Sequence, residues 1–246
     1  NVTCALHPMV HPRIRGLVGT WLAAAWVLAA PVSAQETPSE TGPAEEAEVT
    51  QRISAAEARA AMDRGLKAYR DDRFEEAADF FAEAERGPRD DELDPAAARY
   101  NRGLALLSAG QRDEAAAAFE AARETDDLDL QFRTQFNLGV IRFREAEEKL
   151  DAGAASEALE LFVEARQTFE RAIALAPRDV DAKVNYELAL REQERLLDEL
   201  ARGRELLEEA RESALAGQLE ASRNLLQQIE EEAPAALQLD EKLAKK

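Results

Sequence analysis

"RGLKAYRDDRFEEAADFFAEA", residues 64–84, is matched by "RGLALLSAGQRDEAAAAFEAA" at residues 102–122. In each stretch a glycine is followed by an alanine after twelve residues, a phenylalanine after sixteen and an alanine after nineteen. Small residues at such spacings let two antiparallel helices approach closely, while the aromatic ring fills the angle between neighbouring pairs. The match therefore predicts two copies of a helix-turn-helix unit.

A third copy is centred on "FNLGVIRF", residues 136–143. Large apolar residues crowd this stretch as they would in a strand, but strong helix formers follow in "REAEEKLDAG" and no turn signal precedes Gly153. We therefore predict a helix in which Gly139 occupies the repeat position. This helix has more apolar side chains than one core-facing stripe needs.

The closing half of the third copy is displaced along the chain. "EARQTFERAIALAP", residues 164–177, has the alanine, phenylalanine and alanine of the repeat in the same order, but fourteen residues late. Shared between two helices, the extra length is close to two turns for each, so their faces stay in phase. We expect a hairpin that extends about 10 Å beyond its neighbours, with residues 150–156 as its tip. A tolerated insertion without a role is the alternative.

A fourth copy is weaker. Asn185 stands where Asn101 and Asn137 stand, two residues before the repeat glycine, but Glu187 replaces that glycine. The candidate closing residues are Gly217, Ser222, Leu226, Ile229 and Pro234. Such departures are typical of terminal repeats, which cap a stack.

These copies resemble the tetratricopeptide repeat, a unit of about 34 residues that stacks into a solenoid. The resemblance covers residues 55–236 and implies an all-α, tetratricopeptide-like helix-turn-helix solenoid of about three to five repeats, the third elongated. The large apolar residue that usually precedes the glycine is replaced by Arg64 and Arg102. "APRDVDAKVNYELALREQERL", residues 176–196, is similar to the last repeats of secreted tetratricopeptide proteins of bacterial aerotolerance (Bat-type) systems. Those proteins accompany membrane proteins with von Willebrand factor A domains.

Residues 1–34 have the three parts of a secretory signal peptide. Arg13 and Arg15 begin it, an apolar run of 14 residues follows at positions 17–30, and the small residues "VSA" end it. The apolar run is shorter than the roughly 20 residues that a membrane-spanning helix needs. Residues 1–8 precede Met9 and are read as sequence upstream of the true start.

We therefore expect cleavage between Ala34 and Gln35 and a periplasmic or otherwise exported mature chain without membrane insertion. Retention of the segment as an uncleaved anchor is the alternative. Residues 35–53 mix Pro, Glu, Thr and Gly without apolar periodicity, which predicts a disordered acidic linker. Ser54 and Glu57 have the spacing of a capping box, so the helical region is expected to span residues 54–236, followed by a charged tail at 237–246.

The predicted mature chain lacks most catalytic and metal-binding side chains. All of its cysteine, histidine and tryptophan residues fall in the signal segment: Cys4, His7, His11, Trp21 and Trp26. Because that segment holds two of the 31 Lys and Arg residues and none of the 50 Asp and Glu residues, the remainder has a net charge of −21. The sequence thus predicts no enzyme, no metal, no cofactor and no nucleic-acid partner.

Carboxylates remain as possible sites. Paired Asp and Glu residues could act as acid and base only if burial separated their pKa values, and the repeat places nearly all of them on exposed positions. "RDDELD" at 89–94 and "DDLD" at 126–129 could offer oxygen ligands to calcium, but they lack the spacing of a known loop. We interpret both segments as solvated turns between repeats.

The first helix of each repeat has the strongest site pattern. In the tetratricopeptide family, positions six and three before the glycine, and one, four and five after it, line the concave face. Asparagines two before the glycine often grip a peptide backbone there. The resemblance implies a partner-binding groove formed by Arg59, Met62, Leu66, Tyr69, Arg70, Tyr100, Asn101, Leu104, Leu107, Arg133, Phe136, Asn137, Val140, Phe143, Arg144, Val184, Asn185 and Leu188.

Arginines beside apolar residues suit a protein or peptide partner, namely an acidic extended segment or a membrane-associated envelope protein. Phe143 is the predicted anchor of such a partner. A first alternative is that the apolar residues of this face pack inside a short solenoid and that the asparagines bond a neighbouring helix, because apolar stripes are usually core. A second is a structural homo-oligomer or spacer in the cell envelope, in which the long third hairpin and residues 190–210 pair between copies.

Overall fold

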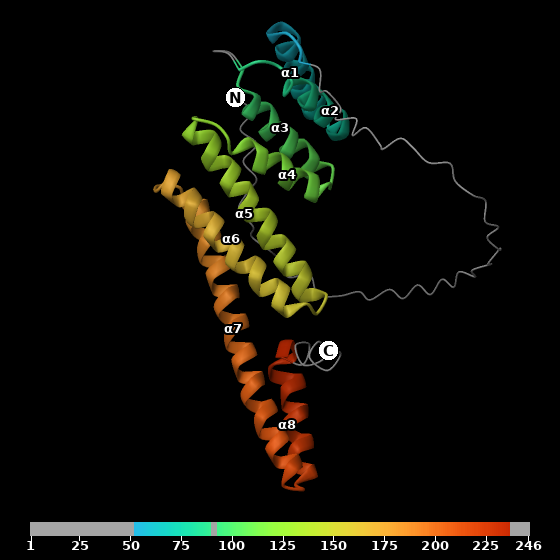
Figure 1. Ribbon diagram of the computed structural model, residues 1–246, viewed down its shortest axis with the longest axis vertical. Helices are drawn as coiled ribbons and strands as arrows, with labels where there is room; N and C mark the ends of the chain where they lie inside the picture. Colours follow the sequence, from blue (N-terminus) through green and yellow to red (C-terminus); the bar gives the residue numbers. More distant parts are fainter. Residues whose placement is uncertain (1–51, 90–92, 237–246) are drawn as a thin grey trace, which may run out of the picture. The chain divides into compact units, whose positions relative to one another are not determined.

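The computed structural model describes residues 52–89 and 93–236. These ranges are helical and contain no strand, which confirms the predicted all-α class (Figure 1). The helices are α1 (Ala55–Arg70), α2 (Phe74–Ala84), α3 (Pro95–Ser108), α4 (Arg112–Ala122), α5 (Leu128–Asp151), α6 (Ala155–Leu175), α7 (Val180–Leu215) and α8 (Leu219–Glu232). The predicted signal peptide, the predicted linker before residue 52 and the predicted tail lie outside the described residues.

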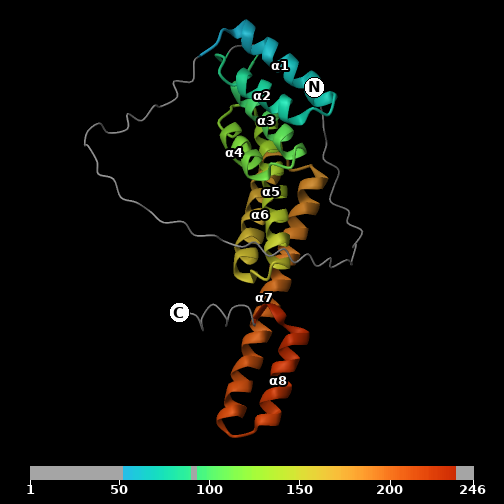
Figure 2. The same ribbon diagram turned by 90° about the vertical axis from the view of Figure 1, so that its right-hand side faces the viewer.

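Helix α1 begins where the capping pattern predicts. The Ser54 side chain accepts a hydrogen bond from the Glu57 backbone N–H, and the Glu57 carboxylate accepts one from the Ser54 N–H at 2.9 Å. From there each helix packs against the next in chain order, so α1–α2, α3–α4, α5–α6 and α7–α8 are antiparallel hairpins (Figure 2). This order of hairpins is the helix-turn-helix solenoid that the repeat pattern predicts.

The repeat glycines allow close contact with the phenylalanine of the closing helix. A Cβ atom added to Gly65, Gly103 or Gly139 would lie 2.6, 2.7 and 2.6 Å, respectively, from a ring carbon of the partner phenylalanine. The partners are Phe81, Phe119 and Phe169, each at most 1% exposed. Three copies thus share one geometry, in which a buried aromatic ring lies directly on the backbone of the first helix.

The third hairpin is elongated as predicted. Twelve residues follow Gly139 in α5, whereas five follow Gly103 in α3. Fourteen residues precede Phe169 in α6, whereas seven precede Phe119 in α4. Each helix therefore gains seven residues, and Gly153, with φ of 78°, makes the turn at the tip.

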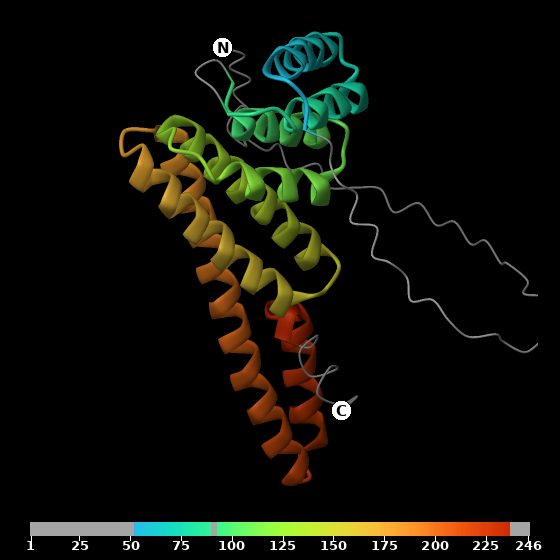
Figure 3. The same cartoon turned by 45° about the horizontal axis from the view of Figure 1, so that its top comes forward.

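The fourth hairpin differs from the sequence prediction. Glu187 is exposed, whereas a Cβ atom on Gly203 of α7, sixteen residues later, would lie 2.1 Å from the Cβ of Ala236, just after the end of α8. Close approach within this pair therefore occurs at Gly203. Because α7 is 36 residues long, its first half packs on α6 and its second half packs on α8 (Figure 3).

Two of the predicted closing residues of this hairpin behave differently from one another. Ile229 is fully buried, but Leu226 is 43% exposed.

None of the helices within residues 52–89 and 93–236, α7 included, combines the length and the apolar character needed to cross a bilayer.

Candidate functional site: the face formed by the first helices

The first helices of successive repeats contact each other through side chains. The Tyr69 and Ser108 hydroxyls are 3.1 Å apart and join α1 to α3. The Asn137 side-chain amide donates to the Tyr100 hydroxyl at 3.2 Å and joins α3 to α5. The predicted groove residues of α1, α3 and α5 therefore form one continuous surface. We call it the first-helix face, made up of Met62, Leu66, Tyr69, Tyr100, Asn101, Leu104, Leu107, Phe136, Asn137, Val140 and Phe143.

Part of this face is open to solvent. Met62, Leu66 and Tyr69 of α1 are half-buried, as are Leu107 of α3 and the α5 pair Phe136 and Val140. In α7, Val184 is 44% exposed and Leu188 is half-buried. A row of partly exposed apolar side chains thus runs across successive first helices.

Other predicted groove residues are core residues, and for them the expected exposure is wrong. Tyr100, Leu104, Asn137 and Asn185 are each at most 8% exposed. Phe143, the predicted anchor for a partner, is 5% exposed, and its ring lies edge-on to Phe162 with centroids 5.4 Å apart. Phe162 stands seven residues before Phe169, the position at which the shorter α4 begins with Arg112, so α6 places an aromatic ring over Phe143 where α4 has only its first residue. In this third repeat the packing alternative is therefore correct at Phe143.

The four predicted groove arginines divide into two pairs. Arg59 donates to the Ala55 carbonyl at 3.2 Å, and Arg133 forms an ion pair with Asp129 at 2.6 Å. Within residues 52–89 and 93–236, Arg70 and Arg144 have neither an ion pair nor a side-chain hydrogen bond. Their guanidinium groups are available to a ligand.

The repeat asparagines form a ladder between first helices. Asn101 donates to Met62 Sδ at 3.5 Å, and Asn137 donates to the Tyr100 hydroxyl. In both cases the acceptor stands three residues before the glycine of the preceding repeat. The equivalent residue for Asn185 is Phe136, which has no hydroxyl group. The Asn185 Oδ1 atom is buried and has no hydrogen-bond partner within the described residues.

Supplying the missing hydroxyl is expected to stabilise the fold. The Phe136 ring lies 6.0 Å from Phe169, as the Tyr100 ring lies 5.6 Å from Phe119, so a tyrosine at position 136 would aim its hydroxyl toward Asn185. We expect Phe136→Tyr to raise the free energy of unfolding by about 1 kcal/mol in urea denaturation. The matched reverse change, Tyr100→Phe, should lower it by about 1–3 kcal/mol because it leaves Asn137 unsatisfied. A loss of stability in Phe136→Tyr would contradict the ladder.

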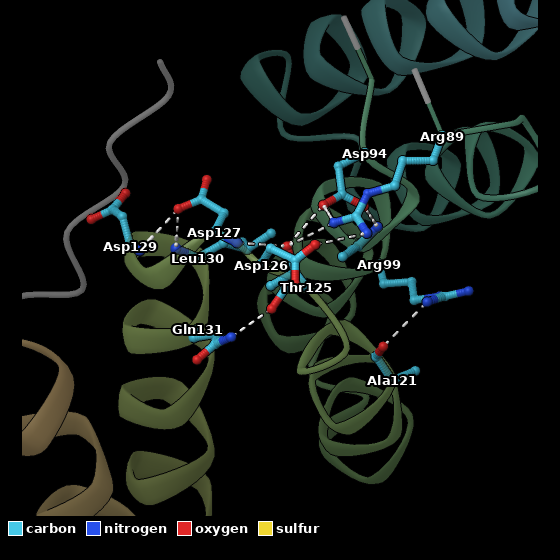
Figure 4. Close-up of polar contacts among 11 residues, drawn as sticks. Arg89, Asp94, Arg99, Ala121, Thr125, Asp126, Asp127, Asp129, Leu130 and Gln131 are labelled. Carbon is cyan, nitrogen blue, oxygen red and sulfur yellow. Dashed lines mark hydrogen bonds and ion pairs between the residues drawn. The ribbon is translucent and has the colours of Figure 1, made fainter. Parts of the chain in front are cut away.

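The acidic segments between repeats serve as helix caps (Figure 4). Asp94 caps α3 by accepting from the Ala96 N–H at 2.9 Å, and it also accepts from the Thr125 hydroxyl at 2.8 Å and Arg89 at 2.7 Å. Asp127 caps α5 by accepting from the Asp129 N–H at 2.9 Å. No group of three potential metal ligands occurs in the described ranges. Asp94 and Asp127 thus act as caps at the ends of the two segments, and residues 90–92 of the first segment lie outside the described residues.

The same contacts set the protonation of Asp94. Burial acts to raise its pKa, but the hydrogen bonds from Ala96, Thr125 and Arg89 outweigh burial and lower it below the usual value. A carboxylate with a lowered pKa stabilises the fold above its unfolded pKa, and this stabilisation is lost as the pH falls through the folded pKa. The junction between the second and third repeats therefore depends on an ionised Asp94 at neutral pH.

Known proteins similar to this chain are found among solved structures, but not among family models or curated proteins. No family model matches the chain, and no curated protein matches it. The chain is similar to the first tetratricopeptide-repeat domain of Spaghetti (RPAP3), solved with the HSP90 peptide SRMEEVD, at 17% identity over 57% of this chain and 96% of that one, with a TM-score of 0.44. It is also similar to the tetratricopeptide-repeat domain of Arabidopsis OM64, at 21% identity over 56% of this chain and 98% of that one, with a TM-score of 0.42.

A tetratricopeptide-repeat protein from Bacteroides fragilis is similar at 16% identity over 55% of this chain and 83% of that one, with a TM-score of 0.32. The fold class itself rests on the repeated glycine–phenylalanine contacts and the order of hairpins. These define the chain as an all-α helical-repeat solenoid of the tetratricopeptide type.

Proposed function

We propose that the chain is a non-catalytic scaffold that binds an extended protein segment along the first-helix face. The observation that carries this proposal is the row of half-buried apolar side chains on α1, α3 and α5, together with Arg70 on α1 and Arg144 on α5. Such a surface suits a ligand with apolar anchors, because partly exposed aliphatic and aromatic residues gain free energy when a partner removes them from water.

The charge of the ligand follows from the two arginines. A guanidinium group binds a carboxylate through two parallel hydrogen bonds, so the favoured ligand is an acidic extended segment or a free C-terminal carboxylate. The anchors are half-buried residues such as Leu66, Tyr69, Leu107, Phe136 and Val140, and they exclude the buried Phe143.

The setting of this function is the cell envelope. The signal-like order of charge, apolar run and small residues within positions 1–34 supports export with cleavage after Ala34. The likeness of residues 176–196 to secreted Bat-type tetratricopeptide proteins suggests an envelope protein as the partner. N-terminal sequencing of the exported chain should find Gln35 first. If the chain is instead found in a membrane fraction with residues 9–34 still attached, the segment is an uncleaved anchor and the export proposal is wrong.

The binding proposal is tested by reversing one charge. The partner is first identified by cross-linking to the tagged chain in its own cell envelope, and its binding segment is then titrated calorimetrically against variants. We expect Arg144→Glu to weaken the affinity at least about tenfold, which corresponds to about 1.4 kcal/mol, with the difference shrinking at high salt.

The matched control is Arg204→Glu, which makes the same charge change on α7. Arg204 is exposed and, within the described residues, has no ion pair. If both variants lose the same affinity, the loss is caused by the change in net charge, and binding at the first-helix face is contradicted.

A structural homo-oligomer is the second candidate, and exposed leucines favour it. Leu215 and Leu219, at the α7–α8 turn, are 89% and 71% exposed, and Leu197 of α7 is 44% exposed. Large apolar residues left in water at one end of a hairpin are typical of contact surfaces. Sedimentation velocity distinguishes the two candidates, because a chain that stays monomeric at all concentrations would exclude the homo-oligomer.

A further inference from the structure

A polar depression of about 460 Å³ lies between α4 and α5, outside the first-helix face. It is lined by Glu120 near the end of α4, by Arg123 and Glu124 directly after that helix, and by Gln131 and Gln135 of α5. None of these five residues belongs to the first-helix face, so the depression is independent of the proposed function. Figure 4 shows part of this junction, where Gln131 points toward Thr125.

Gln135 is the residue that points to a ligand. Its side chain lines the depression, is only 8% exposed, and makes no hydrogen bond within the described residues. Polar side chains of largely buried residues usually have hydrogen-bond partners. The side-chain atoms of the described residues that are both sealed from solvent and unpartnered are Thr134 Oγ1 and Asn185 Oδ1, so the Gln135 amide reaches solvent. The depression therefore offers an unused amide group to a molecule that enters it.

The charges around the depression favour a cation. Arg123 is already paired with Glu120 at 2.6 Å, whereas Glu124 has no partner in the part of the chain that the structure describes. The carboxyl end of α4 adds the partial negative charge of a helix C-terminus. Gln131 uses its side-chain N–H on the Thr125 carbonyl, which leaves its Oε1 atom as an acceptor. The charged lining residues are two glutamates and one arginine, so their formal charges sum to −1.

We propose that the α4–α5 depression binds a lysine or arginine side chain presented by a protein partner. The ammonium or guanidinium group would bind the Glu124 carboxylate and donate to the amide oxygens of Gln131 and Gln135. The charge of this site is opposite to that of Arg70 and Arg144 beside the first-helix face. A partner that uses both surfaces would therefore carry acidic residues for one and a basic residue for the other.

The test uses the full ¹⁵N-labelled chain and two small probes of matched shape, N-acetyl-arginine amide and the neutral N-acetyl-citrulline amide. We expect the arginine probe to shift the side-chain amide signals of Gln131 and Gln135, with a dissociation constant on the order of millimolar. The citrulline probe should leave both signals unchanged. Equal shifts with both probes, or shifts confined to other residues, would overturn the proposal.

Variants locate the charge that matters. Glu124→Gln should weaken binding of the arginine probe at least about threefold, whereas Glu114→Gln, an exposed change of the same charge within α4, should not. Gln135→Leu should remove binding while the remaining amide spectrum stays folded. Because Glu124 is exposed, its replacement does not put folding at risk. If Glu124→Gln and Glu114→Gln bind alike, the depression is not a cation site.

Discussion

Replacing Phe143 by alanine is expected to lower the free energy of unfolding by about 3 kcal/mol or more, measured by urea denaturation. The ring is 5% exposed and lies edge-on to Phe162, which is itself 1% exposed. Truncation would remove buried apolar surface and leave a cavity between α5 and α6, where the surrounding helices cannot close fully.

Leu107→Ala is the matched control, because Leu107 stands at the same repeat position, four residues after the glycine, in α3. Leu107 is only half-buried, so its truncation should lower the free energy of unfolding distinctly less than that of Phe143. If Phe143→Ala left stability intact and removed partner binding instead, Phe143 would be an exposed anchor in solution and the packing of the third hairpin would be different from that described.

Gly103→Ala is the second change with a large expected effect. Alanine normally stabilises a helix by about 1 kcal/mol relative to glycine. Here the new Cβ would lie 2.7 Å from Phe119 Cε1, and that ring is fully buried, so it has no free space to move into. We expect a net loss of about 1–3 kcal/mol in the free energy of unfolding, as for other overpacked cores.

A double-mutant cycle isolates the cause of that loss. Phe119→Leu alone should lower the free energy of unfolding. In the Gly103→Ala background the same change should lower it less, because the smaller side chain makes room for the methyl group. Additive effects of the two changes would mean that the contact between glycine and ring does not set the distance between α3 and α4.

Residue spacing alone was enough to predict the local features of the fold. The capping box at Ser54, the glycine–phenylalanine spacings and the seven-residue extension of each helix in the third hairpin are all local or periodic properties. A helix keeps its faces in phase through about 3.6 residues per turn, so a pattern along the chain translates directly into a face of the structure. For this reason the predicted elongated hairpin agrees with α5 and α6.

The candidate site was predictable only in part. The positions of Arg70, Arg144, Leu66 and Val140 on first helices followed from the repeat register, and these residues are exposed or half-buried. The exposure of Phe143 did not follow, because it depends on Phe162 in another helix. Gln135 gave no signal in the sequence, since only the packing of α4 on α5 encloses it beside Glu124.

By itself the sequence determined the helices, their pairing order and the closest contacts of the first three hairpins, because these depend on short-range spacing and on small residues that allow backbones to approach. Tertiary structure alone decided which apolar residues of the first-helix face stay in contact with water, and it moved the closest contact of the fourth hairpin to Gly203. Exposure depends on which distant side chain covers a position, and no periodicity along one helix contains that information.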